Sequence, residues 1–317
     1  MRVFVTGGCG FIGSHIVDKL IDDGNFVTVY DNFNTGFKFF IEKHLKNKNF
    51  QLIEGDILDT EKLNRTIKGH DVVFHFAALA DVRGAIKNTK LYFDQNIVTT
   101  YNVLEAMRIN DIKEIIFAST AVVYGEPNKF PTSEDYPFVQ TSFYGATKVA
   151  GEAMIQSYSE FYSMKNWIYR FTSWIGERYT HGVVFDFVKK LQQNPKELEI
   201  LGDGTQKKSY LYVEDGVNGV LLGWQKAKNK NNIFNLGYND FMDVKTLAKI
   251  ICDEMKIKNV KYKFLGGPRG WLGDAPLVYL DIKKISKLGW KPKFTIEEGI
   301  RRTVRYMLAN PQILARR

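Results

Sequence analysis

The sequence predicts an α/β fold in which a doubly wound parallel sheet is followed by a smaller, mixed α/β C-terminal domain. Short β-rich runs alternate with helical stretches through the first 120 residues. A glycine-rich segment joins the first of these runs to the first helical stretch, and the second half of the chain is more mixed. Strands separated by helices of this length form βαβ units, which build a parallel sheet.

Each element follows from its local pattern. The expected strands are 3–6, 27–30, 51–54, 72–75, 114–118 and 167–171, and the expected helices are near 12–23, 60–68, 91–108 and 143–163. The second half predicts helices near 182–193, 214–226, 243–255, 281–288 and 295–308, with a hairpin-like stretch near 198–213. We therefore expect one domain at 1–172, with a return segment at 210–237, and a second domain at 173–209 and 238–317.

Composition narrows the class of protein. The chain has 317 residues, of which 44% are hydrophobic, and no apolar stretch approaches the length of a transmembrane span. The opening residues resemble a short strand rather than a signal peptide. The two cysteines are Cys9 and Cys252, and Cys9 lies in the glycine-rich segment, a poor place for a structural disulfide. We expect a reduced, cytoplasmic setting, no membrane partner and no metal site.

The net charge of +9 is unevenly distributed. Residues 256–317 hold 15 Lys and Arg against 4 Asp and Glu, so the rest of the chain carries about −2. Such a segment could form a nucleic-acid face, or a site for an anionic small molecule together with a solvated basic surface. The second interpretation is favoured, because there is no arginine-rich tail and no aromatic RNA-binding signature. No nucleic-acid partner is expected.

The segment Thr6–Gly13 carries glycines at 7, 10 and 13 directly between a strand and a helix. Free backbone N–H groups and the helix dipole at such a place can hold a pyrophosphate, and glycine lets the phosphate approach the backbone. The position makes this a Rossmann-like nucleotide site, although the string alone is weak evidence. Asp31 closes the second strand, where a carboxylate would bind ribose hydroxyls and repel a 2′-phosphate, which favours NAD over NADP. The alternative for Asp31 is an ordinary turn residue.

Two tyrosines precede a lysine by four residues: Tyr144 with Lys148, and Tyr279 with Lys283. The spacing alone indicates little, because most such pairs are surface neighbours. Tyr144 opens a helical run, which would place Lys148 on the same face, whereas Tyr279 lies in a strand-like run. A lysine ammonium beside a phenol favours phenolate, and lowering a tyrosine pKa from about 10 to near 7 requires roughly 4 kcal/mol. Tyr144 is therefore the candidate acid/base, while His75, inside a strand, is expected to be structural.

The motifs taken together resemble the extended short-chain dehydrogenase/reductase family, in its NAD-dependent nucleotide-sugar epimerase branch. They are TGGCGFIGSH at 6–15, DNFNTG at 31–36, GDI at 55–57, HFAA at 75–78, NIVTTYNVLEA at 96–106, FASTAVVYG at 117–125, YGATK at 144–148, GDGTQKKSYLYVED at 202–215 and LGWKP at 288–292. The stretches at 181–187 (HGVVFDF) and 269–274 (RGWLGD) are most similar to UDP-galactose 4-epimerases.

The resemblance implies a role for each matching residue. The catalytic residues would be Thr120, which holds the sugar oxygen, Tyr144 as acid/base, and Lys148, which holds the nicotinamide ribose and lowers the tyrosine pKa. The NAD contacts would be Gly7, Gly10, Phe11, Ile12, Gly13, Asp31, Asn32, Asn34, Thr35, Gly36, Asp56, Ile57, Phe76, Ala77, Ala78, Ala80, Asn96 and Ser119, besides Tyr144 and Lys148. The substrate contacts would be Thr120, Tyr144, Ser173, Lys208, Arg269, Asp274 and Val278.

The residues after Thr120 separate branches of the family. In the family that this chain resembles, the 4,6-dehydratases carry Asp-Glu at these two positions, because removal of water needs an acid and a base. This chain has Ala121 and Val122, neither of which can move a proton, so elimination and decarboxylation are disfavoured. What remains is oxidation and re-reduction at one carbon of a nucleotide sugar, and the resemblance implies UDP-glucose and UDP-galactose as the substrates.

Four departures from the family pattern leave the sugar open. Ser173 stands where an asparagine is usual, and Lys208 replaces an arginine, so it cannot make a bidentate fork. Three residues separate Arg269 from Gly273, where many relatives have one. Val278 is small at the position that gates 2-acetamido groups, so an N-acetylhexosamine could fit.

Alternative functions remain open at this point. One is an epimerase acting at another carbon, or a reductase, on a UDP-N-acetylhexosamine or a CDP- or GDP-sugar. Another is a non-catalytic NAD-binding relative, which the presence of both Tyr144 and Lys148 disfavours. The helices near 91–108 and 143–163 resemble those that pair family members as homodimers. Their apolar positions (Val103, Leu104, Met107, Met154, Ile155 and Tyr158) could equally be intramolecular core.

Overall fold

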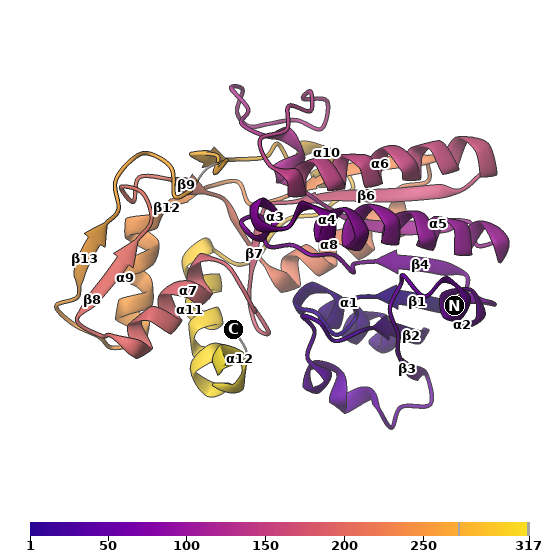
Figure 1. Cartoon of the computed structure of the whole chain (residues 1–317), viewed down its shortest axis with the longest axis horizontal. Coiled ribbons are helices and arrows are strands. Elements are labelled where there is room, and N and C mark those ends of the chain that lie inside the picture. The colour runs from indigo at the N-terminus through magenta and orange to yellow at the C-terminus, as the bar shows by residue number, and fades with distance from the viewer. Residues whose placement is uncertain (272, 316–317) are drawn as a thin grey trace. The chain divides into compact units, whose positions relative to one another are not determined.

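A computed structural model of the chain describes residues 1–271 and 273–315, so Leu272 in the 269–274 motif and Arg316 and Arg317 at the expected end of the second domain lie outside the described residues. The chain forms two compact units (Figure 1). Unit 1 comprises Met1–Val123, Ser142–Arg170 and Val220–Phe234, and unit 2 comprises Tyr124–Thr141, Phe171–Gly219 and Asn235–Arg317. The segment 124–141 thus clusters with the second unit, whereas we expected it inside the 1–172 domain. That the first domain binds NAD and the second binds the nucleotide sugar, as the family resemblance implies, remains a prediction.

A seven-stranded sheet confirms the predicted α/β fold class. Its order is β11-β6-β5-β4-β1-β2-β3. The strands are β1 (Arg2–Thr6), β2 (Phe26–Asp31), β3 (Phe50–Glu54), β4 (Val72–His75), β5 (Glu114–Thr120), β6 (Lys165–Phe171) and β11 (Asn231–Leu236). β1 pairs in parallel with β2 and β4, β2 with β3, and β4 with β5. All six expected strands are present, and the order 3-2-1-4-5-6 is that of a doubly wound nucleotide-binding sheet.

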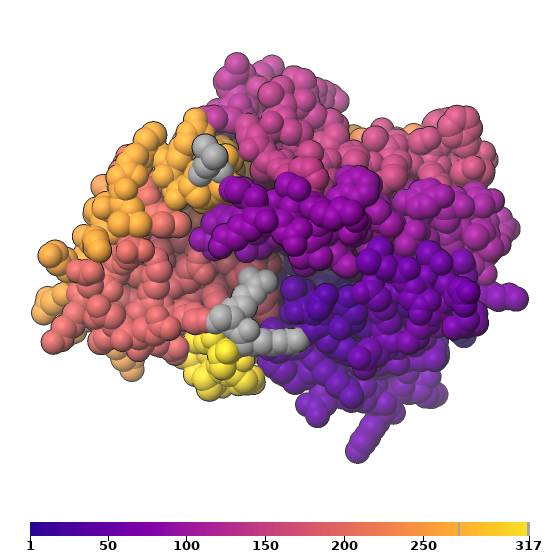
Figure 2. Space-filling view, viewed as in Figure 1, coloured from indigo at the N-terminus to yellow at the C-terminus, as the bar shows by residue number. Residues whose placement is uncertain are grey.

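Three helices cover one face of this sheet in unit 1: α2 (Thr60–Ile67), α5 (Thr99–Ile109) and α6 (Phe143–Tyr162). Their apolar stripes pack on the strands, with Leu104 and Ile155 fully buried against residues such as Phe4. Helix α1 (Phe11–Asp22) contacts β1 and β2, and Trp224 of α8 (Val213–Lys226) packs edge-on against Phe74, with the ring centroids 5.2 Å apart. α5 and α6 lie side by side and reach the surface in the space-filling view (Figure 2).

The helix expected near 91–108 is interrupted. The structure has two short helices, α3 (Gly84–Lys87) and α4 (Thr89–Tyr92), then a π-helical turn at Phe93–Val98, and only then α5. Two 3₁₀ turns, at Lys38–His44 and Ala121–Tyr124, were also not expected. π-helical turns are rare and occur mostly at functional sites, and this one carries the predicted cofactor residue Asn96.

Unit 2 contains three small sheets. β7 (Ser173–Ile175) pairs in parallel with β10 (Tyr210–Tyr212), and β8 (Glu197–Ile200) pairs in parallel with β13 (Lys261–Phe264). The third sheet has the order β12-β9-β14, from Met242–Asp243, Lys207–Lys208 and Leu277–Val278. The expected hairpin at 198–213 is therefore wrong: β8, β9 and β10 each pair with a strand distant in sequence, which a local pattern cannot show.

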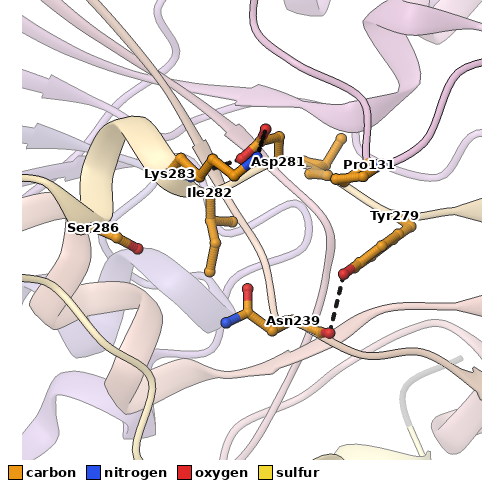
Figure 3. A pocket seen from close by; sticks show the side chains of 8 residues that line it. Pro131, Asn239, Tyr279, Asp281, Ile282, Lys283 and Ser286 are labelled. Atoms are coloured by element: carbon orange, nitrogen blue, oxygen red, sulfur yellow. Dashed lines mark hydrogen bonds and ion pairs between the residues drawn. The ribbon is translucent and has the colours of Figure 1, made fainter.

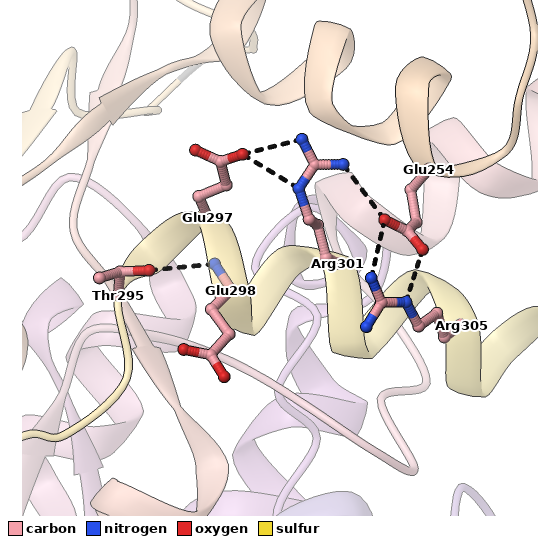
Figure 4. Close-up of polar contacts among 6 residues, drawn as sticks. All are labelled: Glu254, Thr295, Glu297, Glu298, Arg301 and Arg305. Atoms are coloured by element: carbon pink, nitrogen blue, oxygen red, sulfur yellow. Dashed lines mark hydrogen bonds and ion pairs between the residues drawn. The ribbon is translucent and has the colours of Figure 1, made fainter.

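The longer helices of unit 2 lie close to the predicted ranges, whereas the helix expected near 281–288 spans only 283–286 and the helix at 312–315 was not expected. α7 (Val183–Gln193), α9 (Val244–Glu254) and α11 (Ile296–Ala309) contact one another, and α10 (Lys283–Ser286) and α12 (Gln312–Ala315) are short. The Thr295 hydroxyl caps α11 by accepting from Glu298 N at 3.2 Å. Glu254 on α9 bonds both Arg301 and Arg305 on α11, and Glu297 bonds Arg301 as well (Figure 4). The arginines of the basic segment that lie on α11 are thus paired with carboxylates.

The lysines of the basic C-terminal segment lie on the surface. They are Lys256, Lys258, Lys261, Lys263, Lys283, Lys284, Lys287, Lys291 and Lys293, and each is exposed. This agrees with a solvated basic surface. Cys9 and Cys252 are both free and buried. Within 1–271 and 273–315, none of the helices has the length and apolar character needed to cross a bilayer.

Candidate active site

The predicted cofactor residues gather at one edge of the sheet. They follow the carboxyl ends of β1, β2, β3, β4 and β5, which are neighbours in the order β5-β4-β1-β2-β3. In a doubly wound sheet, ligands bind outside the carboxyl ends of the strands where the strand order reverses, here between β1 and β4. The sequence therefore places these residues where the topology provides a binding crevice.

The glycine-rich loop is closely packed, and two of its glycines are structurally required. Gly7 has φ +70°, and a Cβ there would lie 2.6 Å from the backbone nitrogen of Ala77. A Cβ on Gly13 would lie 2.1 Å from the carbonyl oxygen of Gly7. Helix α1 begins at Phe11 without a side-chain cap, so the positive end of its dipole lies at this loop, where it favours an anion. These features fit a bound pyrophosphate.

Asp31 and its loop pack against the glycine-rich loop. The buried carboxylate of Asp31 accepts hydrogen bonds from the backbone N–H groups of Cys9 and Phe33, both at 2.9 Å. Asn32 donates to the Asp56 carboxylate at 3.1 Å, and Phe37 N donates to Cys9 O at 2.9 Å. Asp31 thus fixes the loop that it adjoins, partly through the bond to Phe33 N that a turn aspartate makes, and its binding of ribose hydroxyls remains a prediction. Burial raises the pKa of the Cys9 thiol, so this cysteine is an unreactive thiol.

His75 is structural, as expected. It lies at the end of β4 and is 1% exposed. Its ring nitrogens contact the Thr6 hydroxyl at 2.7 Å and the Thr100 hydroxyl at 3.1 Å. Burial lowers its pKa to about 3, and the nearby Lys148 contributes. The imidazole is therefore neutral and links β1 to α5.

Asn96 has a structural function that the sequence did not reveal. Its side-chain amide accepts from Leu79 N at 2.8 Å and donates to Leu79 O at 3.2 Å. It also donates to the Thr147 hydroxyl at 3.0 Å. Because Thr147 directly precedes Lys148, Asn96 ties the loop after β4 to helix α6. The π-helical turn that presents Asn96 has no distinct sequence pattern.

Helix α6 places Tyr144 in its first turn and Lys148 in the next. The Ser142 hydroxyl caps the helix by accepting from Gly145 N at 3.1 Å. Tyr144 is 7% exposed, and Thr120, at the end of β5, hydrogen-bonds its phenol. Burial raises the pKa of Tyr144, the Thr120 bond opposes that rise, and the neighbouring Tyr92 adds to it. In this structure Tyr144 is therefore a neutral phenol.

Lys148 is 3% exposed, and its ammonium lies 4.2 Å from the centre of the Phe117 ring. Burial lowers its pKa from the ordinary value of 10.5 to about 7, while the Glu152 carboxylate acts in the opposite direction. The three predicted catalytic residues thus come together in unit 1, but Lys148 is not among the groups that act on the pKa of Tyr144 here. Desolvation of the phenol outweighs the bond from Thr120, and the lowering of the tyrosine pKa by Lys148 remains a prediction.

A buried polar network lies beneath the catalytic residues. Glu152, fully buried one turn after Lys148, accepts from the Ser119 hydroxyl at 2.5 Å and from Arg170 at 2.7 Å. Arg170 is 2% exposed and lies near the carboxyl end of β6. Sequence reasoning placed Ser119 at the cofactor and did not identify Glu152 or Arg170. Two signals could have found them: the four-residue step from Lys148 and a charge inside the apolar run 167–171.

Several hydrophobic side chains also lie around Tyr144. Tyr144 packs in a cluster with Ala85 and Tyr92, against which Leu79, Val82 and Val122 also pack. The Tyr92 hydroxyl donates to Asp81 O at 2.5 Å. Val122 therefore stands beside the acid/base candidate where an elimination reaction would need a proton-transfer group. Tyr92 has no sequence signal that would have marked it.

Besides Thr120 and Tyr144 in unit 1, the other five predicted substrate residues lie in unit 2, and three of them are hydrogen-bonded together. Lys208 donates to the Asp274 carboxylate at 2.7 Å, and Arg269 donates to Asp274 O at 3.0 Å. Val278 on β14 is the register partner of Lys208 on β9. Ser173 opens β7 opposite Tyr210, and no hydrogen bond joins it to the other four within the described part of the chain. That these residues bind the substrate remains a prediction.

The second tyrosine–lysine pair differs from the first. Tyr279 and Lys283 line a cavity of about 330 Å³ in unit 2, together with residues such as Pro131 and Asn239 (Figure 3). The Tyr279 hydroxyl donates to Asn239 O at 3.1 Å, and Lys283 is 81% exposed and paired with Asp281. This pair therefore consists of a phenol hydrogen-bonded to the backbone and a solvated lysine, in contrast to the buried pair on α6.

Comparison with known proteins agrees with these features. The model of the NAD dependent epimerase/dehydratase family matches residues 3–237. A putative UDP-glucose 4-epimerase of Methanocaldococcus jannaschii is 39% identical over 97% of this chain and 99% of its own length. The solved UDP-glucose 4-epimerase of Thermotoga maritima with UDP-glucose is 33% identical, with a TM-score of 0.88, over 98% of this chain and all of the other.

A further solved structure is the UDP-glucuronic acid 4-epimerase of Bacillus cereus in complex with UDP-glucuronic acid and NAD. It is 28% identical, with a TM-score of 0.89, and the match covers 98% of this chain and 99% of that one. The family model spans more than half of the chain, and it begins at β1 and ends just after β11. The chain therefore belongs to the NAD-dependent epimerase/dehydratase family.

Proposed function

We propose that this protein is an NAD-dependent nucleotide-sugar epimerase that interconverts UDP-glucose and UDP-galactose through a 4-keto sugar. The observation that carries the proposal is the hydrogen-bonded Thr120–Tyr144 pair beside the buried Lys148, with Val122 as the neighbouring side chain. This arrangement offers one proton-transfer group in an apolar setting. A single acid/base suits oxidation and re-reduction of one carbinol.

The nucleotide crevice supports NAD as the cofactor. Gly7 and Gly13 leave room for a pyrophosphate against the loop, and the positive end of the α1 dipole favours its charge. Asp31 at the end of β2 would bind the adenosine ribose. A bound NAD would supply a hydride acceptor and donor for the sugar carbon and, while oxidised, a positive charge.

The residues of the chain then supply the proton chemistry. Tyr144 would remove the proton of the C4 hydroxyl and return it, while Thr120 holds the same oxygen. Since the pKa of Tyr144 is raised by burial, the phenol can act as a base only when positive charge is placed beside it. Lys148, whose pKa is near 7, can provide such a charge near neutral pH.

Unit 2 supports a nucleoside diphosphate as the other part of the substrate. Lys208 and Arg269 offer two cations, and the Asp274 carboxylate can accept hydrogen bonds from hydroxyl groups. Val278 is small and half-buried beside Lys208. This second observation favours UDP-N-acetylhexosamine as an additional substrate, because a 2-acetamido group needs room.

Product analysis tests the proposal. The protein would be incubated separately with UDP-glucose, UDP-N-acetylglucosamine, UDP-glucuronic acid and a CDP-hexose, and the products identified by NMR. We expect UDP-galactose from UDP-glucose without added oxidant. Turnover of a different sugar alone would replace the proposed substrate, and no turnover of any nucleotide sugar would overturn the reaction itself.

Two further properties complete the proposal. A homodimer is supported by the exposed apolar side chains on α5 and α6, among them Tyr101, Ile109 and Phe161, which are 47%, 58% and 79% exposed. The earlier candidates Val103, Leu104, Met107 and Ile155 are instead buried in the core of the same chain. A cytoplasmic location is supported by two buried, unpaired cysteines.

A further inference from the structure

Arg269 already binds a carboxylate within its own unit. Its Nη2 donates to Glu126 Oε1 at 2.7 Å, and its Nη1 donates to Glu126 Oε2 at 2.8 Å. This two-point contact is the geometry with which a guanidinium also binds phosphate oxygens. The two side chains are 42% and 41% exposed, so an incoming ligand can reach the pair. An anion that binds the fork of Arg269 must therefore replace Glu126.

The loop that carries Glu126 is held in place. Gly125 has φ +64°, and a Cβ there would lie 1.7 Å from the carbonyl oxygen of Val139. Tyr124 is 1% exposed, and its hydroxyl donates to the Asn235 side chain at 2.7 Å. Glu126 therefore extends from a fixed backbone position.

The other cation of the set is compensated in a different way. Lys208 bonds Asp274, whose carboxylate also accepts from Gly270 N at 3.1 Å, and both side chains are mostly buried. Lys208 also donates to Ala275 O. Asp274 thus orders its own loop, whereas both oxygens of the Glu126 carboxylate bond Arg269. Of the two carboxylates, Glu126 is the one that a ligand can displace with little structural change.

We propose that Glu126 is a positioning and specificity residue that occupies the fork of Arg269 until the diphosphate of a nucleotide sugar displaces it. The inference rests on the proposed function, because it takes the diphosphate as the ligand of Arg269. Glu126 keeps the guanidinium aligned in the free protein. It also lowers the affinity of Arg269 for anions, because an anion must displace the carboxylate in order to bind. A ligand with one weak charge cannot displace a two-point carboxylate, whereas a diphosphate can. Glu126 also opposes the bound diphosphate by like-charge repulsion, which speeds release of the nucleotide.

The test is Glu126→Gln, which removes the charge and keeps the shape. The dissociation constant of UDP and the KM for UDP-glucose should fall about threefold to tenfold, while the affinity for uridine, which has no phosphate, stays unchanged. The difference between the variant and the wild type should shrink in 1 M salt, because the pair is partly exposed. kcat should not rise, since release of nucleotide becomes slower.

The matched control is Glu297→Gln. Glu297 is also an arginine-paired carboxylate of unit 2, 55% exposed and bonded to Arg301 (Figure 4). The substitution Glu297→Gln removes one negative charge from α11 and leaves Arg269 untouched, so the affinity for UDP should not change. If Glu297→Gln tightens UDP as much as Glu126→Gln does, the effect is one of net charge and the inference is wrong.

A double-mutant comparison tests whether Glu126 acts through Arg269. In an Arg269→Met background, Glu126→Gln should change UDP affinity less than about twofold. An undiminished effect in that background, or a Glu126→Gln protein that binds UDP more weakly than the wild type, would overturn the inference. Wild-type epimerisation of UDP-sugars is measured first, so that failure of the proposed function is seen separately.

Discussion

At the residue scale, the buried Tyr144–Lys148 pair combines two opposite effects of desolvation. Burial raises the pKa of Tyr144 and lowers that of Lys148 to about 7. Both shifts favour the neutral forms of the two side chains. Added positive charge favours the tyrosinate, and a neutral lysine near pH 7 can take up or release a proton easily. The pair is therefore sensitive to what binds beside it.

Replacing Tyr144 with Phe tests its role in proton transfer. We expect turnover to fall by about 10²–10⁴-fold, because the general acid/base is lost while the ring still fills the cluster with Ala85 and Tyr92. Epimerisation is measured by NMR with UDP-glucose. The thermal unfolding midpoint and NAD content serve as controls and should remain close to the wild type. Turnover comparable to the wild type would remove Tyr144 from the mechanism.

Replacing Lys148 with Met tests the cost of its burial. The folded pKa of about 7 lies below the ordinary 10.5, so between these values the unfolded chain binds more protons and the free energy of unfolding rises with pH. The penalty is complete below pH 7 and disappears as pH rises past 10.5. With NAD removed from both proteins, Lys148→Met should be more stable by about 2–4 kcal/mol at pH 7, and by about 1 kcal/mol at pH 9.5.

Chemical denaturation at the two pH values measures this difference. Lys148→Arg is the control, because a guanidinium stays charged throughout the range and should destabilise the protein at both values. A stability difference between Lys148→Met and the wild type that does not depend on pH would show that Lys148 is not a shifted group.

At the element scale, helix α6 is joined to strand β6 through Glu152 and Arg170. Both side chains are almost completely buried, and Arg170 Nη2 lies 2.7 Å from Glu152 Oε2. A buried ion pair adds little net stability, but breaking it leaves an uncompensated charge. Its value here is position, because Glu152 also holds Ser119, next to Thr120, and lies one turn from Lys148.

Glu152→Gln should lower the free energy of unfolding by about 3–5 kcal/mol, because Arg170 would remain charged in the core. The double variant Glu152→Leu with Arg170→Leu should recover most of this loss, since it removes both charges. Urea denaturation measures both effects. If the single variant loses less than about 1 kcal/mol, water reaches Arg170 and the pair is not buried in solution.

The elements also show what sequence can and cannot predict. The six strands and the helix of Tyr144 and Lys148 were predictable, because apolar periodicity and turn residues are local. The π-helical turn at 93–98 was not predictable, because one extra residue in a single helical turn leaves no distinct apolar pattern in the sequence. The local pattern at 198–213 predicts a hairpin. It misses the true pairing of β8, β9 and β10, because their partner strands lie far away in sequence. The bond between Glu126 and Arg269, 143 positions apart, has no local signal either.

At the scale of the whole molecule, the distribution of apolar surface has a consequence for assembly. α5 and α6 bury one face in unit 1 and still expose Tyr101, Ile109, Phe161 and Tyr162. Phe161, at 79%, is the most exposed large hydrophobic residue in the described chain. Neighbouring exposed apolar groups on a helix pair are typical of an interface. Two copies related by a twofold axis would place these same helices against each other.

Phe161→Asp tests this assembly. The wild type should behave as a dimer in light scattering coupled to size exclusion, and the variant should weaken dimerisation at least about tenfold, because a carboxylate would be buried in an apolar contact. Leu308→Asp is the matched control: Leu308 is 40% exposed on α11 of unit 2 and should leave the dimer intact. A monomeric wild type, or equal dissociation by both variants, would contradict a dimer through α5 and α6. Unchanged thermal unfolding of the Phe161→Asp monomer would further show that these helices are held by their own core rather than by a partner.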